Sequence, residues 1–242
     1  MTREPLAVMA KPTIAPLQVV LIGTYPPRQC GIATFTRDLA EAVATPAPGG
    51  WPAAVGFARR ARPTFEVSVV AIDSERRDFP AEVRRRLDPE RPGDYLAVAG
   101  WLNHASIDAV SLQHEFGIYG GPDGERILAL AGELDVPLVT TFHTVLQRPS
   151  PNQRRVVRTL AERSTRVVVL SNGAARTLRE VYALDPARIA VVPHGVPDLP
   201  LVDPERVKPL VGLSGRPVVL SFGLLGPGKG YELAIRAMAD VI

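Results

Sequence analysis

Two histidines near the middle of the chain stand where an α/β protein places ligand-binding side chains. His114 and His143 each follow a short apolar run, at residues 109–112 and 136–141, and the segment between them has helical spacing. A strand, a helix and a second strand in this order form the βαβ unit of a parallel sheet. Because ligands bind outside the carboxyl ends of parallel strands, we expect both histidines at the edge of the sheet that forms a ligand site.

The residues around these histidines add further candidates. A neutral imidazole such as that of His143 can donate a hydrogen bond to a hydroxyl group or accept a proton, although a lone histidine is often structural. His114 could instead anchor its strand end, and Glu115 does not complete a zinc motif because no partner histidine stands at helical spacing. Tyr119 lies in the glycine-rich loop at residues 117–123, which could admit a ligand. His114, Glu115 and Tyr119 are therefore candidate substrate contacts.

The loop at residues 24–33 is a second candidate contact, because it follows the first apolar run and contains Gly31. Two prolines stiffen this loop, and the glycine lets a ligand approach the backbone. We expect Thr34 or Thr36 to cap the helix that follows, and the free amide groups at a helix start can bind an anion. The alternative is a plain connection between a strand and a helix.

The segment at residues 221–230 carries glycines and one lysine between an expected strand and an expected helix. Gly223 and the glycines that follow permit a phosphate to approach the backbone, and Lys229 adds a positive charge at the helix start. The segment is not a P-loop, because Gly230 stands where serine or threonine is required, and the dinucleotide-binding fingerprint is absent. It indicates phosphate binding of a less specific kind.

The elements that position these residues alternate between strand and helix. Expected strands are short apolar runs bounded by turn residues, and they span residues 17–23, 65–72, 109–112, 136–141, 166–170, 188–192 and 217–222. Further expected helices span residues 81–87, 94–103, 152–163, 172–182 and 229–241. This alternation predicts an α/β fold, a Rossmann-like parallel sheet with helices on both faces.

Composition narrows the class of protein. The 242 residues suit one large domain or two modest ones, and 28 basic against 25 acidic residues leave a net charge of +3, too small to favour nucleic acid. A weakly basic face could still meet an anionic membrane surface. Cys30 is the only cysteine, which excludes an intrachain disulfide and fits a reducing cytoplasm. No apolar run reaches the roughly 18 residues typical of a transmembrane helix.

The expected organisation is a main domain followed by the start of another. We expect a flexible leader at residues 1–16, a domain at 17–197 with a surface excursion at 46–63, and a linker at 198–215. Residues 216–242 offer one strand and one helix, which cannot bury their own apolar faces. They either dock on the first domain or begin a second domain of a longer protein, and we favour the second interpretation.

Several motifs together resemble the family 4 glycosyltransferases, which are retaining enzymes of the GT-B fold. They are the loop around Gly31, the strand ends LQHEFGIYGG and TTFHT, the run VVVLSNGAARTL, the hinge IAVVPHGV and the segment VVLSFGLLGPGKGYELAIRA. Each motif is loose by itself, but they occur in the order of the family and cover nearly the whole chain.

The resemblance implies a second Rossmann-like domain that is only begun in this chain, and a cleft in which a nucleotide diphosphate sugar is the co-substrate. It places His143 beside the transferred sugar as the catalytic residue, and Gly31, Gly223 and Lys229 near the donor diphosphate. It implies a mannosyl- or glucosyltransferase that uses no bound metal and no cofactor. The acceptor would be a sugar, a glycan or a lipid-linked molecule, met in the cytoplasm or at the inner face of the membrane.

Two features depart from the family pattern. Leu224 occupies the position where the family often has an arginine paired with the lysine, and the paired glutamates of the family would lie beyond Ile242. We therefore expect little transfer by this chain alone. The alternatives are a non-catalytic sugar- or nucleotide-binding module of the same fold, a sugar-nucleotide epimerase, or a phosphorylase.

Overall fold

The computed structural model describes residues 15–45, 64–196, 199–223, 225–226 and 229–241. The chain divides into two compact units, Met1–His194 and Gly195–Ile242, and each is described by itself. Most of the expected leader and the whole expected excursion at residues 46–63 lie outside the described residues.

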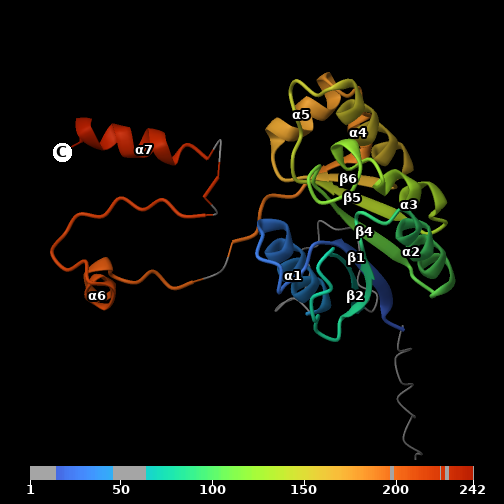
Figure 1. Cartoon of the computed structure of the whole chain (residues 1–242), viewed down its shortest axis with the longest axis horizontal. Coiled ribbons are helices and arrows are strands. Elements are labelled where there is room, and N and C mark those ends of the chain that lie inside the picture. Colours follow the sequence, from blue (N-terminus) through green and yellow to red (C-terminus); the bar gives the residue numbers. More distant parts are fainter. Residues whose placement is uncertain (1–14, 46–63, 197–198, 224, 227–228, 242) are drawn as a thin grey trace, which may run out of the picture. The chain divides into compact units, whose positions relative to one another are not determined.

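The first unit is built on a parallel sheet. Its described residues form seven strands in the order β3-β2-β1-β4-β5-β6-β7, and every neighbouring pair is parallel (Figure 1). The strands are β1 (Leu17–Gly23), β2 (Phe65–Ile72), β3 (Val83–Leu87), β4 (Ala109–His114), β5 (Leu138–Phe142), β6 (Arg166–Val169) and β7 (Ile189–Val191). The predicted parallel α/β sheet is thus confirmed.

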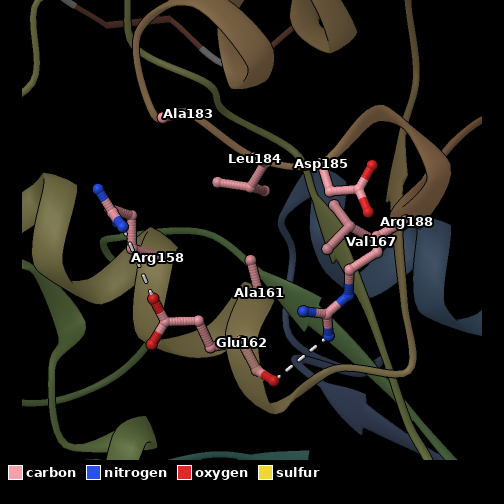
Figure 2. Close-up of a pocket in the computed structure, with 8 residues that line it drawn as sticks. All are labelled: Arg158, Ala161, Glu162, Val167, Ala183, Leu184, Asp185 and Arg188. Atoms are coloured by element: carbon pink, nitrogen blue, oxygen red, sulfur yellow. Dashed lines mark hydrogen bonds and ion pairs between the residues drawn. The ribbon is translucent and has the colours of Figure 1, made fainter.

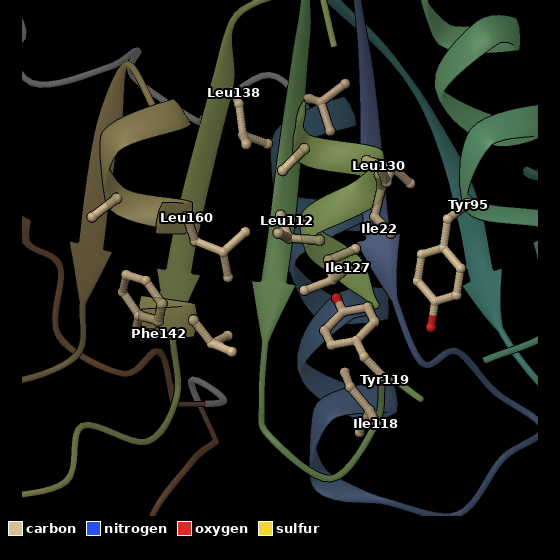
Figure 3. Packing of buried hydrophobic residues seen from close by; sticks show 14 of the residues in the cluster. Ile22, Tyr95, Leu112, Ile118, Tyr119, Ile127, Leu130, Leu138, Phe142 and Leu160 are labelled. Carbon is tan, nitrogen blue, oxygen red and sulfur yellow. The ribbon is translucent and has the colours of Figure 1, made fainter. Parts of the chain in front are cut away.

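Helices cover both faces of this sheet, as the alternation predicts. They are α1 (Gly31–Ala44), α2 (Pro92–His104), α3 (Ile127–Glu133), α4 (Pro151–Arg163) and α5 (Asn172–Glu180). On one face, Figure 3 shows Ile22 and Leu112 of the sheet packed with Leu130 of α3 and Leu160 of α4. A smaller cluster on the other face joins Leu21 of β1 to residues of α1 and β2. Successive strand side chains point to opposite faces, so one strand can supply both clusters.

The helix predicted at residues 81–87 is wrong, because this segment contains the edge strand β3. Leu87 is fully buried in the larger core cluster, and the guanidinium of Arg85 lies 4.9 Å from the ring centre of Trp101. Pairing with β2 and burial of the apolar end residues override the local sequence pattern. The charged side chains suit an edge strand, which must avoid pairing with other chains.

The predicted capping residues of α1 are also wrong. The helix begins at Gly31, and Cys30 caps it, because its sulfur accepts a hydrogen bond from the amide of Ala33 at 3.4 Å. Thr36 lies one turn inside the helix, where its hydroxyl donates to the carbonyl of Ile32 at 2.7 Å. A threonine inside a helix satisfies its hydroxyl in this way instead of capping the helix.

The second unit contains α6 (Pro204–Val207), α7 (Tyr231–Ala237), a 3₁₀ turn at Lys208–Val211 and another at Met238–Asp240. Residues 217–222, predicted as a strand, are not a strand in the structure. A strand exists only where its backbone is hydrogen-bonded to a neighbour, and the described residues of this unit include no strand that could pair with it. The expected helix at 229–241 begins at Tyr231 and ends as a 3₁₀ turn.

Candidate active site

His114 and His143 meet at the carboxyl ends of neighbouring strands. His114 is the last residue of β4, and His143 follows the last residue of β5. The backbone amide of His143 donates to the carbonyl of His114 at 3.0 Å, which continues the pairing of the two strands by one step. The predicted convergence at this edge of the sheet is therefore correct for the backbone.

The side chains of these residues have different environments. His143 is half-buried, and its Nε2 lies 3.1 Å from Oε1 of Gln113, which is next to His114 in β4. Because strand side chains alternate between faces, Gln113 and His114 point to opposite sides of the sheet. The side chain of His143 therefore lies on the same side of the sheet as that of Gln113, and the side chain of His114 is buried on the opposite side.

His114 is enclosed by aromatic rings. Its ring centre lies 5.0 Å from that of Phe116, 5.2 Å from that of Phe142 and 6.1 Å from that of Tyr119. The side chain is fully buried, and within the described part of the chain neither ring nitrogen has a hydrogen-bond partner. Loss of water around the ring, with a smaller effect from His143, lowers the pKa of His114 to about 3. His114 is thus a neutral core residue with no surface open to solvent in this structure.

Tyr119 and Glu115 form hydrogen bonds that hold the segments after β4 and β5 in place. The buried hydroxyl of Tyr119 donates to the backbone carbonyl of Gln113 at 2.7 Å. The carboxylate of Glu115 accepts from the hydroxyl of Thr144 at 2.6 Å and from the amide of Phe116 at 3.0 Å. These bonds fix the segments that follow β4 and β5, whereas direct substrate contact by Glu115 or Tyr119 stays a prediction.

His143 is also in contact with α1. The ring centre of Phe35 lies 4.7 Å from that of His143 and 5.2 Å from that of His194, in edge-to-face geometry both times. Burial, and to a smaller extent the neighbouring charge of His194, lowers the pKa of His143 to about 4. The imidazole is therefore neutral near pH 7, and it can accept a hydrogen bond from a hydroxyl group through a nitrogen that carries no proton.

Gly31 is the first residue of α1, one turn before Phe35, and it is exposed. A Cβ added to Gly31 would meet no atom within 4 Å. The start of α1 thus has open space beside Gly31, and the amides of a helix start that have no partner can bind an anion. Contact between Gly31 and the donor stays a prediction. The structure brings this helix start to the same edge of the sheet as His143, since Phe35 contacts the imidazole.

The other two predicted phosphate contacts belong to the second unit. Gly223 has a φ of 133°, a conformation that favours glycine, and a Cβ there would lie 3.0 Å from the hydroxyl of Tyr231. Lys229 is exposed and lies two residues before the start of α7. Leu224, which departs from the family pattern, lies outside the described residues. The roles of Gly223 and Lys229 stay predictions.

The sequence did not indicate Gln113 or Phe35 as site residues, and it assigned His194 only to a hinge or cleft wall. In the structure Gln113 and Phe35 contact the imidazole of His143, and His194 contacts Phe35. Strand alternation was a usable signal for Gln113. Residue 113 pairs with residue 141, and residues 141 and 143 point to the same face of the sheet. The positions of Phe35 and His194 depend on how α1 and the end of the first unit pack, which spacing alone does not reveal.

A cavity of about 110 Å³ lies elsewhere in the first unit, beside the amino end of β6 (Figure 2). Its charged side chains are already engaged, because Arg158 pairs with Glu162 at 3.9 Å and Arg188 donates to the carbonyl of Glu162 at 3.3 Å. It contains none of the predicted site residues.

Among the described residues, no three His, Cys, Asp or Glu side chains are placed to hold a metal ion. No helix in the described ranges has the length and apolar character needed to cross a membrane.

Part of this chain is similar in sequence to known glycosyltransferases. A D-inositol 3-phosphate glycosyltransferase from Segniliparus rotundus is 36% identical over 124 residues, which cover 45% of this chain and 27% of that protein. A protein of the same name from Rhodococcus erythropolis is 32% identical over 122 residues, which cover 44% of this chain and 27% of that protein. The matched stretch thus spans little more than a quarter of either relative.

A solved structure supports the fold. The crystal structure of a glycosyltransferase from Rickettsia africae ESF-5 superimposes with a TM-score of 0.59 at 16% identity, over 93% of this chain and 57% of that one. The family model described as Glycosyltransferase Family 4 matches residues 31–198, more than half of the chain and most of the parallel sheet. This chain therefore belongs to glycosyltransferase family 4.

Proposed function

We propose that this chain supplies the acceptor-side domain of a retaining hexosyltransferase, which moves a mannosyl or glucosyl unit from a nucleotide diphosphate sugar to a hydroxyl group. The observation that supports this most is the neutral, half-buried imidazole of His143 at the carboxyl end of β5. The open start of α1 at Gly31 adds an anion-binding feature at the same edge of the sheet.

The proposed reaction needs little covalent participation by the protein. The acceptor oxygen bonds to the anomeric carbon on the face from which the diphosphate leaves, and the bond to the diphosphate breaks with its electron pair. The acceptor proton passes to a diphosphate oxygen. His143 holds a sugar hydroxyl through its unprotonated nitrogen, while Lys229 and the amides near Gly31 stabilise the leaving charge. We propose that this stabilisation works without a metal or a further cofactor.

The proposed acceptors include phosphorylated polyols. Two relatives carry the name D-inositol 3-phosphate glycosyltransferase, and each matches less than half of this chain. An acceptor panel should therefore contain inositol phosphates beside free sugars, glycans and lipid-linked sugars.

We place the reaction in the cytoplasm, with peripheral contact at the inner membrane face, because the net charge is weakly positive and Cys30 is a free thiol. Sedimentation with anionic vesicles tests the membrane part.

The experiment uses the complete product of the reading frame to which this chain belongs. The protein is incubated with nucleotide sugars and the acceptor panel, and the product is analysed by mass and by the anomeric coupling in its proton spectrum. We expect a glycoside with the donor configuration. His143→Ala should lower transfer by roughly 100-fold or more while the protein stays folded, and His104→Ala, at an exposed position, is the matched control.

The alternatives give different products. An epimerase forms no glycoside, and a phosphorylase depends on inorganic phosphate. A binding module of the same fold retains a nucleotide sugar without turning it over. An inverted anomeric configuration, or full activity of His143→Ala, would contradict the proposal.

A further inference from the structure

Gln113 is the only described side chain that forms a hydrogen bond to the imidazole of His143. Its amide oxygen lies 3.1 Å from Nε2, and an amide oxygen can only accept. Its amide nitrogen donates to the hydroxyl of Ser111 at 3.1 Å, two residues back on the same face of β4. Both ends of the Gln113 amide therefore have a partner, and the oxygen faces the histidine.

The position of Gln113 is fixed by tight packing. The side chain is fully buried, and its backbone carbonyl accepts the hydroxyl of Tyr119. A Cβ on Gly23 of β1 would lie 3.1 Å from the Cβ of Gln113 and 2.8 Å from the hydroxyl oxygen of Thr36. The glycine at the end of β1 thus leaves the space into which the side chains of Gln113 and Thr36 pack, and a larger residue at position 23 would collide with them.

We propose that Gln113 is a positioning residue that holds His143 in the tautomer protonated on Nε2. In a neutral imidazole one nitrogen carries the proton, and the hydrogen bond made by the other nitrogen decides which. With Nε2–H donated to Gln113, Nδ1 keeps a free lone pair, and within the described residues it has no hydrogen-bond partner. Nδ1 is then the atom that accepts a hydrogen bond from a substrate hydroxyl. The catalytic part of this inference rests on the proposed function, but the tautomer does not.

The tautomer can be measured on the 242-residue chain without any substrate. Nitrogen spectra of the protein labelled with ¹⁵N-histidine distinguish the two neutral forms and follow their titration. We expect neutral His143 to carry its proton on Nε2. In Gln113→Met, which keeps the length of the side chain and removes the acceptor, we expect a mixture of both tautomers. Gln147→Met, in an exposed position after β5, is the matched control and should leave the spectrum unchanged.

A second variant keeps the acceptor and adds a charge. Gln113→Glu should retain protonation on Nε2 and raise the pKa of His143, because a carboxylate stabilises the imidazolium. The other titratable groups near His143 are His194 across Phe35, His114 at the end of β4, and Glu115 bound to Thr144. All three are present in every variant, so a change in the titration of His143 reports the residue at position 113.

Activity of the complete reading-frame product completes the test. We expect Gln113→Met to lower kcat about tenfold, the equivalent of one neutral hydrogen bond, with less change in the donor KM. In Gln113→Glu the acid limb of the pH profile should move to higher pH. Neutral His143 protonated on Nδ1, or an unchanged tautomer in Gln113→Met, would overturn the inference. If no transfer occurs with any donor, the proposed function fails, while the nitrogen spectra still decide the role of Gln113.

Discussion

The backbones of His114 and His143 are adjacent, but their side chains lie in different environments, and we therefore assign them different roles. The imidazole of His114 lies among three aromatic rings and has no hydrogen-bond partner in the described chain. The imidazole of His143 is half-buried and bound to Gln113. Burial, with a smaller effect from His143, keeps the first imidazole neutral. The second is also neutral, and in the proposed tautomer its Nδ1 is the atom that accepts from a ligand.

Both histidines should make the stability of the protein depend on pH. Their pKa values of about 3 and about 4 lie below the ordinary 6.5. As pH falls from 6.5 toward 4, the unfolded chain binds protons that the folded chain does not bind, so the free energy of unfolding decreases. Each histidine contributes up to about 1.4 kcal/mol for every pH unit in this window.

The substitution His114→Phe should flatten this dependence and remove two unpaired buried nitrogens. We expect a free energy of unfolding at pH 7 that is equal to or about 1 kcal/mol above that of the unmodified protein, since an unsatisfied buried polar group is unfavourable. Urea unfolding at a series of pH values between 4.5 and 7 measures both effects, with His104→Phe at an exposed position as the control. An unchanged slope in His114→Phe would show that His114 is not buried in its neutral form.

A substitution at Gly31 can distinguish a role in stability from a role in donor binding. Because a Cβ there meets no atom, Gly31→Ala should leave stability unchanged or raise it by up to about 1 kcal/mol, the helix preference of alanine. If the donor approaches this backbone, its KM should rise in the complete reading-frame product. Gly100→Ala is the control, because Gly100 also lies in a helix with open space around it and is remote from His143 in the sequence. Equal donor KM values for both variants would remove Gly31 from the site.

At the scale of elements, apolar runs predicted the strands well because each central strand of a parallel sheet is buried on both faces. The runs before His114 and His143 therefore located the edge of the sheet at which both histidines lie. The edge strand β3 was missed, since Arg84 and Arg85 break its apolar pattern and its pairing with β2 is a long-range effect. Residues 217–222 show the opposite error, because their apolar pattern predicted a strand and the structure has none there. An apolar run becomes a strand only when its backbone pairs with a neighbouring strand.

The start of α1 was also placed wrongly, and its cap can be tested. Cys30→Ala should lower the free energy of unfolding by about 0.5–1 kcal/mol, because the amide of Ala33 loses its acceptor. Cys30→Ser should be at least as stable as the unmodified protein, because a hydroxyl oxygen is a stronger acceptor than a thiol sulfur. Urea titrations of the three proteins give the comparison. Equal stability of the alanine and serine variants would show that this cap contributes nothing.

For the whole molecule, the match to the family and the parallel sheet were both predictable from the order of the motifs. The family match ends at residue 198, close to the division between the two units at His194 and Gly195. The contacts around His143 were less predictable, because Phe35, Gln113 and His194 come from three segments far apart in the sequence. Tertiary packing brings them together, and no local pattern records it.

A prediction at this scale concerns metal ions. We propose that Lys229 and backbone amides stabilise the leaving diphosphate, so transfer by the complete reading-frame product should persist after dialysis against a chelator. Initial rates before and after chelation, and after addition of Mg²⁺ or Mn²⁺, measure this. Loss of transfer on chelation with recovery on adding either ion would show that a divalent cation takes the role proposed for Lys229.

The most direct measurement is release of nucleoside diphosphate by the complete reading-frame product, over a panel of nucleotide sugars with and without acceptors. The proposed transferase predicts that one donor releases its diphosphate faster when an acceptor is present, and that His143→Ala abolishes this stimulation. A folded protein that binds a nucleotide sugar but releases no diphosphate with any acceptor would contradict it and leave a binding module of the same fold.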